Sequence, residues 1–243
     1  MGRQFNGTSD YLASASALAY SSAQKMAISY WSYWDTFAND DKELLTSGNF
    51  ANTGWYQLSP NASASSAYAI AIYNGSGYTI RTFVRPSAAT WHHYVVNIDG
   101  TDAANFCIPS VYVDGVSKAL TNSSSGATSF TVGNLILYLM SSDTPGGFGA
   151  GQLADFAIYT GLNLSSTDAS TLYGGTLPGS VQSGNLIYYW KCCGDNSPET
   201  PSVGSVNLTV NGTTKVSHPT PVLSSCAAPA PDQFVKVSLR AAP

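Results

Sequence analysis

The chain has 243 residues, of which 10% are charged and 44% hydrophobic, and its formal net charge is −4 at pH 7. A disordered chain combines high charge with low hydrophobicity, so this composition excludes one. The ten lysines and arginines are scattered singly and form no basic patch for phosphates, so we expect no nucleic-acid partner. The longest apolar run, 135–140, is much shorter than the ~20 residues of a membrane helix, so we expect no membrane partner either.

Alternating apolar and polar residues predict a long series of strands. In chain order, the expected strands cover 25–34, 54–59, 67–73, 78–84, 91–98, 110–113, 116–120, 135–140, 153–159, 186–192 and 206–210. Asn74-Gly75 and Asp114-Gly115 fall between such runs, as hairpin turns do. Many short strands rich in aromatic and β-branched residues predict an all-β fold.

One short helix is predicted after the strand at 153–159. Ser165 to Asp168 resemble a capping box in which aspartate replaces the usual glutamate. Residues 169–173 form the helical turn, and Gly174-Gly175 end it. The glycine-rich stretch 144–151 is predicted to be a flexible loop rather than a phosphate loop, because no Lys-Ser/Thr pair follows it.

The segment 217–243 differs from the rest because it holds five of the twelve prolines. Proline cannot donate to a strand ladder, so we expect an extended tail. The apolar alternation Phe234–Leu239 suits a strand added to a sheet edge of a partner. We therefore divide the chain into a sandwich domain over 1–216 and a docking tail over 217–243.

The four cysteines allow three pairings. Cys192 and Cys193 are neighbours whose side chains point to opposite faces of a strand, so they are not expected to pair with each other. We predict that one of them bonds Cys226 and fixes the tail to the sandwich or to a neighbouring copy. The alternative is four free thiols, as expected in a reducing cytoplasm.

Residues for catalysis are sparse. A retaining glycosidase needs two carboxyl groups about 5–5.5 Å apart, and the only two glutamates, Glu43 and Glu199, lie in no such pattern. The acidic run 40–43 is interpreted as a solvated turn, with calcium binding as the sharper alternative. His92 and His93 face opposite sides of a strand and are interpreted as structural. We therefore predict no catalytic residues, no metal site and no cofactor.

Aromatic side chains are the candidates for ligand binding. Trp34, Trp55, Tyr56 and Tyr73 are the residues we select for stacking on a glycan. The alternative is that such rings fill the core, as they do in most sandwiches.

Five segments together resemble one known superfamily. They are 5–12 (FNGTSDYL), 26–31 (MAISYW), 91–100 (WHHYVVNIDG), 111–115 (VYVDG) and 151–159 (GQLADFAIY). Their order and spacing are similar to the concanavalin A-like, laminin-G-like jelly-roll superfamily. The resemblance implies a two-sheet antiparallel jelly-roll sandwich with one short helix and an extended C-terminal tail. Residues 186–190 and 207–212 resemble a strand pair that many relatives place first, which implies a permuted arrangement with the last strands over 186–216.

The superfamily includes lectins, adhesion modules, glycosidases and virion proteins, so the fold does not decide function. No apolar segment typical of a signal peptide follows Met1, and a weakly charged sandwich with a docking tail resembles phage virion proteins. The first hypothesis is a non-enzymatic capsid decoration (cement) protein, made in the host cytoplasm and displayed on the virion surface. Its expected partners are a major capsid protein or other virion protein, bound through the tail, and further copies of itself in a homo-oligomer or symmetric array. The alternative is a carbohydrate-binding or adhesion module, such as a tail adhesin, that binds surface glycans.

Overall fold

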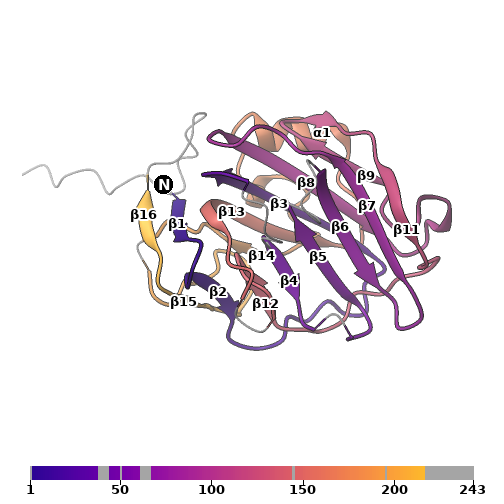
Figure 1. Cartoon of the computed structure of the whole chain (residues 1–243), viewed down its shortest axis with the longest axis horizontal. Helices are drawn as coiled ribbons and strands as arrows, with labels where there is room; N and C mark the ends of the chain where they lie inside the picture. The colour runs from indigo at the N-terminus through magenta and orange to yellow at the C-terminus, as the bar shows by residue number, and fades with distance from the viewer. Residues whose placement is uncertain are drawn as a thin grey trace, which may run out of the picture.

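The computed structural model describes residues 2–37, 44–49, 51–60, 67–143, 146–194 and 196–216. The acidic run 40–43, Cys226 and the whole predicted tail 217–243 lie outside these residues. Two antiparallel sheets of eight strands each are stacked on one another, which confirms the all-β jelly-roll sandwich (Figure 1). No helix in the described ranges is long and apolar enough to cross a membrane.

We call the first sheet sheet A. In spatial order it consists of β10 (Val116–Ser117), β9 (Ser110–Val113), β8 (Trp91–Asp99), β3 (Lys25–Trp34), β13 (Ala150–Thr160), β1 (Gly2–Asn6) and β16 (Thr214–Val216), with β14 (Leu186–Trp190) also paired to β13.

We call the second sheet sheet B. In spatial order it consists of β11 (Thr121–Ser125), β7 (Tyr78–Val84), β6 (Ala67–Tyr73), β5 (Trp55–Ser59), β4 (Leu45–Ser47), β12 (Leu137–Leu139), β2 (Tyr11–Ser14) and β15 (Leu208–Asn211).

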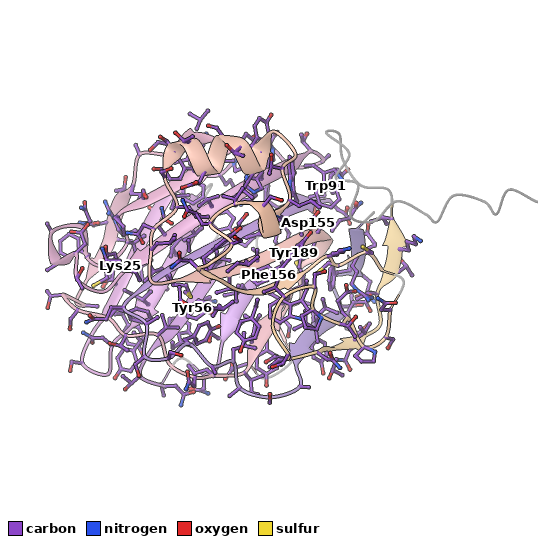
Figure 2. The ribbon with its side chains drawn as sticks, turned by 180° about the vertical axis from the view of Figure 1, so that it is seen from behind. Lys25, Tyr56, Trp91, Asp155, Phe156 and Tyr189 are labelled. Atoms are coloured by element: carbon purple, nitrogen blue, oxygen red, sulfur yellow. The ribbon has the colours of Figure 1, made fainter. Side chains whose placement is uncertain are left out.

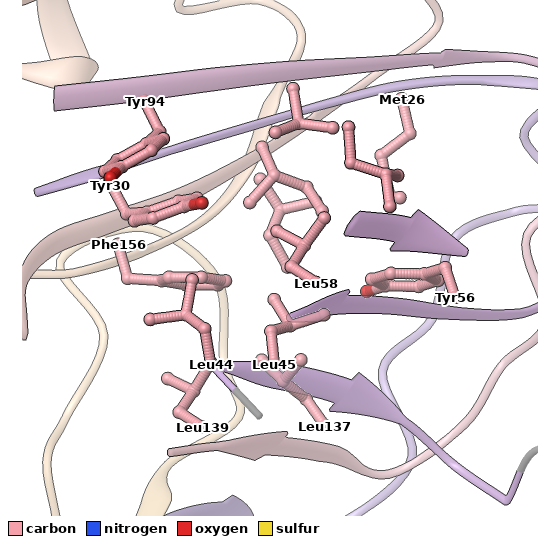
Figure 3. Packing of buried hydrophobic residues seen from close by; sticks show 14 of the residues in the cluster. Met26, Tyr30, Leu44, Leu45, Tyr56, Leu58, Tyr94, Leu137, Leu139 and Phe156 are labelled. Atoms are coloured by element: carbon pink, nitrogen blue, oxygen red, sulfur yellow. The ribbon is translucent and has the colours of Figure 1, made fainter. Parts of the chain in front are cut away.

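The core lies between the sheets and combines aliphatic side chains with aromatic rings (Figure 3). The ring of Tyr30 stacks between Tyr94, at 5.0 Å between centroids, and Phe156, at 6.0 Å. Its hydroxyl is 2.7 Å from that of Tyr68, so a hydrogen bond joins β3 of sheet A to β6 of sheet B. Burial raises the pKa of both phenols well above their usual value, so both stay neutral.

The C-terminal strands complete both sheets beside the N-terminal ones. β16 pairs with β1, and β15 pairs with β2. Between them, the buried guanidinium of Arg3 lies 2.6 Å from the carboxylate of Glu199, which also accepts the backbone N–H of Cys192 at 3.1 Å. Removing either partner would leave a buried charge uncompensated, so this ion pair ties β1 to the segment that precedes β15.

One helix and the chain after it cover the outer face of sheet A (Figure 2). The helix α1 (Ser166–Tyr173) begins with a capping box, in which the Ser165 hydroxyl accepts the Asp168 N–H at 3.1 Å and the Asp168 carboxylate accepts the Ser165 N–H at 2.9 Å. Leu172 of α1 and Val181 pack onto Val95 and other apolar residues of sheet A. Two short 3-10 helices, η2 (Ala103–Asn105) and η3 (Pro178–Ser180), lie in the connections.

Candidate ligand-binding groove on the open sheet

Two of the four aromatics selected from the sequence point into the core. Trp34 is 2% exposed and Tyr56 is fully buried, with its hydroxyl 2.5 Å from that of Tyr20. The prediction that these two rings stack on a glycan is therefore wrong. Both occupy the phase of their strand that faces the opposite sheet, where no ligand can reach them.

The other two, Trp55 and Tyr73, lie side by side on the outer face of sheet B. They are cross-strand partners on β5 and β6, and Tyr73 is in turn the partner of Tyr78 on β7. The Tyr73 and Tyr78 rings stack at 4.4 Å between centroids, and Trp55 meets Tyr78 edge-on at 6.3 Å. The register thus gathers three rings from three strands into one row. Aromatic content is the sequence signal that pointed to Trp55 and Tyr73, but it does not show which phase of a strand faces outward.

A second row of cross-strand partners runs beside the aromatic one. Thr46 on β4 is opposite Gln57, Gln57 is opposite Ala71, and Ala71 is opposite Ile80. These side chains share one face because residues directly opposite each other on paired strands point to the same side of the sheet. None of these four side chains is an aromatic ring, and the sheet is hollowed here next to the larger rings.

Two adjoining cavities occupy this hollow. The first, of about 360 Å³, is lined by Thr46, Trp55, Gln57, Tyr78, Ile80 and Asp143 among others. The second, of about 330 Å³, is lined by Asn49, Asn52, Asn134, Tyr138 and Asp143 among others. Since Asp143 borders both, we treat them as one feature and call it the groove. Together they are in the size range of small-molecule sites.

The aromatic end of the groove holds an unpaired donor. Trp55 is 5% exposed, and its indole Nε1 is buried without a hydrogen-bond partner in the described part of the chain. Buried polar groups are nearly always paired, so an unpaired one needs an explanation. A ligand or water acceptor reaching this nitrogen would provide one.

The other end of the groove presents amide donors. The side-chain oxygens of Asn49, Asn52 and Asn134 accept backbone N–H groups from Ala51, Asn49 and Tyr20 at 2.8–2.9 Å. These bonds orient the three amides and engage the single side-chain oxygen of each, which leaves their NH₂ groups as donors. The groove therefore combines ring faces at one end with fixed hydrogen-bonding groups at the other.

The cysteines lie away from the groove. Cys107 and Cys192 are buried free thiols, and Cys193 is disulfide-bonded. Cys192 is therefore not a disulfide partner, because its side chain is enclosed in the core, where burial raises its pKa well above the usual value. The pairing of Cys193 with Cys226 stays a prediction, since Cys226 lies outside the described residues.

The two histidines of β8 have structural partners. His93 is buried, and burial lowers its pKa to about 3, while its Nε2 lies 3.0 Å from the hydroxyl of Ser29. The Nδ1 of His92 lies 2.7 Å from the carboxylate of Asp114. Within the described ranges, no three His, Cys, Asp or Glu side chains come together as metal ligands.

The molecule is thus a two-sheet antiparallel jelly-roll sandwich in which a helix covers one outer face and the other outer face is hollowed and lined in part by aromatic rings. The model of the concanavalin A-like lectin/glucanases superfamily matches residues 6–168, and the chain belongs to this superfamily. No curated protein matches the chain in sequence.

Three solved structures illustrate the shared fold. A putative carbohydrate binding protein from Bacteroides ovatus superposes with a TM-score of 0.60 at 14% identity, covering 88% of this chain and 58% of its own. The heptameric SAP-like pentraxin from Limulus polyphemus gives 0.53 at 13% identity, covering 86% and 94%. The CBM40 of a Ruminococcus gnavus IT-sialidase, bound to α2,3-sialyllactose, gives 0.52 at 12% identity, covering 71% and 96%. At these identities the likeness establishes the fold alone.

Proposed function

We propose that the chain is a non-enzymatic carbohydrate-binding module and that the groove on sheet B holds the glycan. One observation carries the proposal: the row of Trp55, Tyr73 and Tyr78 lies beside a cavity whose other end is lined by oriented amides. The printed descriptions of two structural neighbours, a putative carbohydrate binding protein and a sialyllactose-bound CBM40, support it.

Sugars have the surface that such a groove complements. The C–H faces of a pyranose pack on aromatic rings, and its hydroxyls need both donors and acceptors around the rim. The rings of Trp55 and Tyr78 supply the apolar contact, while Asn49, Asn134 and the side chain of Asp143 supply the polar ones. A purely hydrophobic ligand would leave the amides and the carboxylate unpaired at a cost.

Hydrolysis fits the groove less well than binding. Asp143 is the only carboxylate among its described lining residues, whereas glycoside hydrolysis uses a pair of carboxyl groups. Glu199, one of the two glutamates of the chain, is buried in its ion pair with Arg3.

A place on a phage particle remains a second proposal. It rests on the sequence, in particular on the docking segment 217–243, which lies outside the described residues. The proposed capsid partner, the virion location and the self-association stand on the same footing. Both proposals are compatible, because a decoration protein with a glycan-binding sandwich would hold a particle to glycosylated surfaces.

A glycan array probed with the full chain and with Tyr78→Ala tests the binding proposal. We expect the wild-type chain to bind a defined subset of glycans and the variant to lose about tenfold in affinity, since it removes a stacking surface of the groove. Tyr173→Ala is the matched control: Tyr173 is a partly exposed tyrosine on α1, stacked on Trp31 over sheet A.

The control variant is expected to bind as the wild type does, and thermal unfolding verifies that both variants are folded. A wild-type chain that binds no glycan, or equal losses in the two variants, would contradict the proposal.

A further inference from the structure

The charge of the groove comes from one side chain. Asp143 is half-buried and is the only charged residue among the described residues that line either cavity. It forms no hydrogen bond or ion pair with another described residue. A carboxylate accepts up to four hydrogen bonds, and no other described residue occupies this capacity.

Asp143 lies where the two cavities meet. It borders Thr46, Trp55 and Tyr78 on one side and Asn134 and Tyr138 on the other. Burial, the Asp143 carboxylate and Tyr11 together raise the pKa of the Tyr138 phenol, so the negative field of Asp143 acts on this side chain of the groove.

The other polar groups among the described lining residues are neutral. The amide oxygens of Asn49, Asn52 and Asn134 accept backbone N–H groups, so their NH₂ groups, like the unpaired indole N–H of Trp55, are uncharged donors available to a ligand. An acidic sugar entering the groove would place its own carboxylate or sulfate near Asp143, with no cation among the described lining residues to offset the repulsion. Uncharged hydroxyls would instead donate to Asp143 and accept from the amides.

We propose that the groove selects uncharged glycans and rejects acidic ones, and that Asp143 is the specificity-determining residue. The inference rests on the proposed function and deepens it by naming the chemical class of the ligand. Stacking on the aromatic row would not distinguish a charged sugar from an uncharged one. The proposed selectivity therefore comes from Asp143.

The test is a glycan array of matched pairs that differ by a single sialic acid or a single sulfate. We expect the wild-type chain to bind the uncharged member about three- to tenfold more strongly, the effect of one like charge at contact distance in a partly hydrated site. In Asp143→Asn this ratio is expected to fall by about threefold or more, mainly because binding of the acidic member increases. High salt is also expected to lower the wild-type ratio of affinities for the uncharged and the acidic member, since screening shortens the range of the repulsion.

Asp102→Asn is the control for net charge. It removes the same charge away from the groove, and asparagine keeps the N-cap acceptor that Asp102 provides to the Asn105 N–H of η2. Its ratio is expected to equal that of the wild type. If Asp143→Asn does not fold, Asp143→Ser serves as the second variant.

The outcomes separate the two proposals. If the wild-type chain binds acidic and uncharged members with equal affinity, or if the ratio is unchanged in Asp143→Asn, the role of Asp143 is overturned. The proposed glycan binding is not affected by either outcome. An equal loss for both members in the variant also overturns it, since Asp143 would then contact hydroxyls without selecting. A wild-type chain that binds no member of any pair overturns the proposed function and this inference with it.

Discussion

The outer faces of the two sheets are used in different ways. On sheet A, Trp31 is 3% exposed because Tyr173 of α1 and Leu177 pack over it. On sheet B, Trp55 is nearly as buried, at 5%, and the ring that meets it edge-on, Tyr78, belongs to the same sheet. Burial under a separate element stabilises the fold and closes the face, whereas burial among side chains of the same face leaves a groove open to solvent.

The largest expected effect is on the covered face. Trp31→Ala removes a ring from beneath α1 and is expected to lower the free energy of unfolding by about 4 kcal/mol, through lost burial and a residual cavity. Urea unfolding measures this loss. Tyr33→Ala, two residues along on the same face but only half-buried, is the control and should cost much less. Equal losses in the two variants would show that the cover is not tightly packed.

A second effect on the covered face depends on pH. Burial lowers the pKa of His93 to about 3, and the attraction of Asp114 offsets only part of this shift. The unfolded chain binds a proton at this histidine below about pH 6.5, while the folded chain does not, so stability is complete above that pH and falls as the pH decreases. The slope is about 1.4 kcal/mol per pH unit, or about 3 kcal/mol by pH 4.

Urea unfolding at about pH 7 and about pH 4.5 measures this slope, and His93→Gln should remove most of it. The carboxylates of Asp99 and Asp114 have lowered pKa values and add to the loss only at lower pH, below about 4. A wild-type slope that His93→Gln leaves unchanged would assign the pH dependence to another group.

The smallest expected effect is on stability, from the start of the helix α1 that covers sheet A. Ser165→Ala removes the N-cap of α1 and is expected to cost about 1 kcal/mol, measured as a shift in thermal unfolding. Glycan binding on sheet B is expected to stay unchanged, because the groove has no residue in α1. If binding falls with the cap, the two faces are coupled and the contrast between them is weaker than the structure indicates.

Much of the fold was predictable from local patterns. The strand at 25–34, the hairpin at Asn74-Gly75 and the capping box at Ser165 appear where the sequence placed them. These features depend on neighbouring residues, and the physics that sets them acts over a few positions. The short strands β1, β2, β4, β11 and β16 were not predicted as strands. Thr121–Ser125, for instance, has no apolar alternation and is a strand because it pairs with β7.

For the candidate site, too, local sequence predicts some features and not others. Trp34 and Trp55 both lie in strands rich in aromatics, and alternation says only that each has one of two phases. Trp34 faces the core because it shares the strand phase of Ile28 and Tyr30, which pack between the sheets. Trp55 faces outward because Tyr56 and Leu58 occupy the inward-facing phase of β5. The sequence by itself determined the strands, their turns and the aromatic content of this protein. Only the tertiary structure decided which face became a groove, because that depends on where the distant segment 161–185 packs and on the register that aligns Trp55, Tyr73 and Tyr78 across three strands.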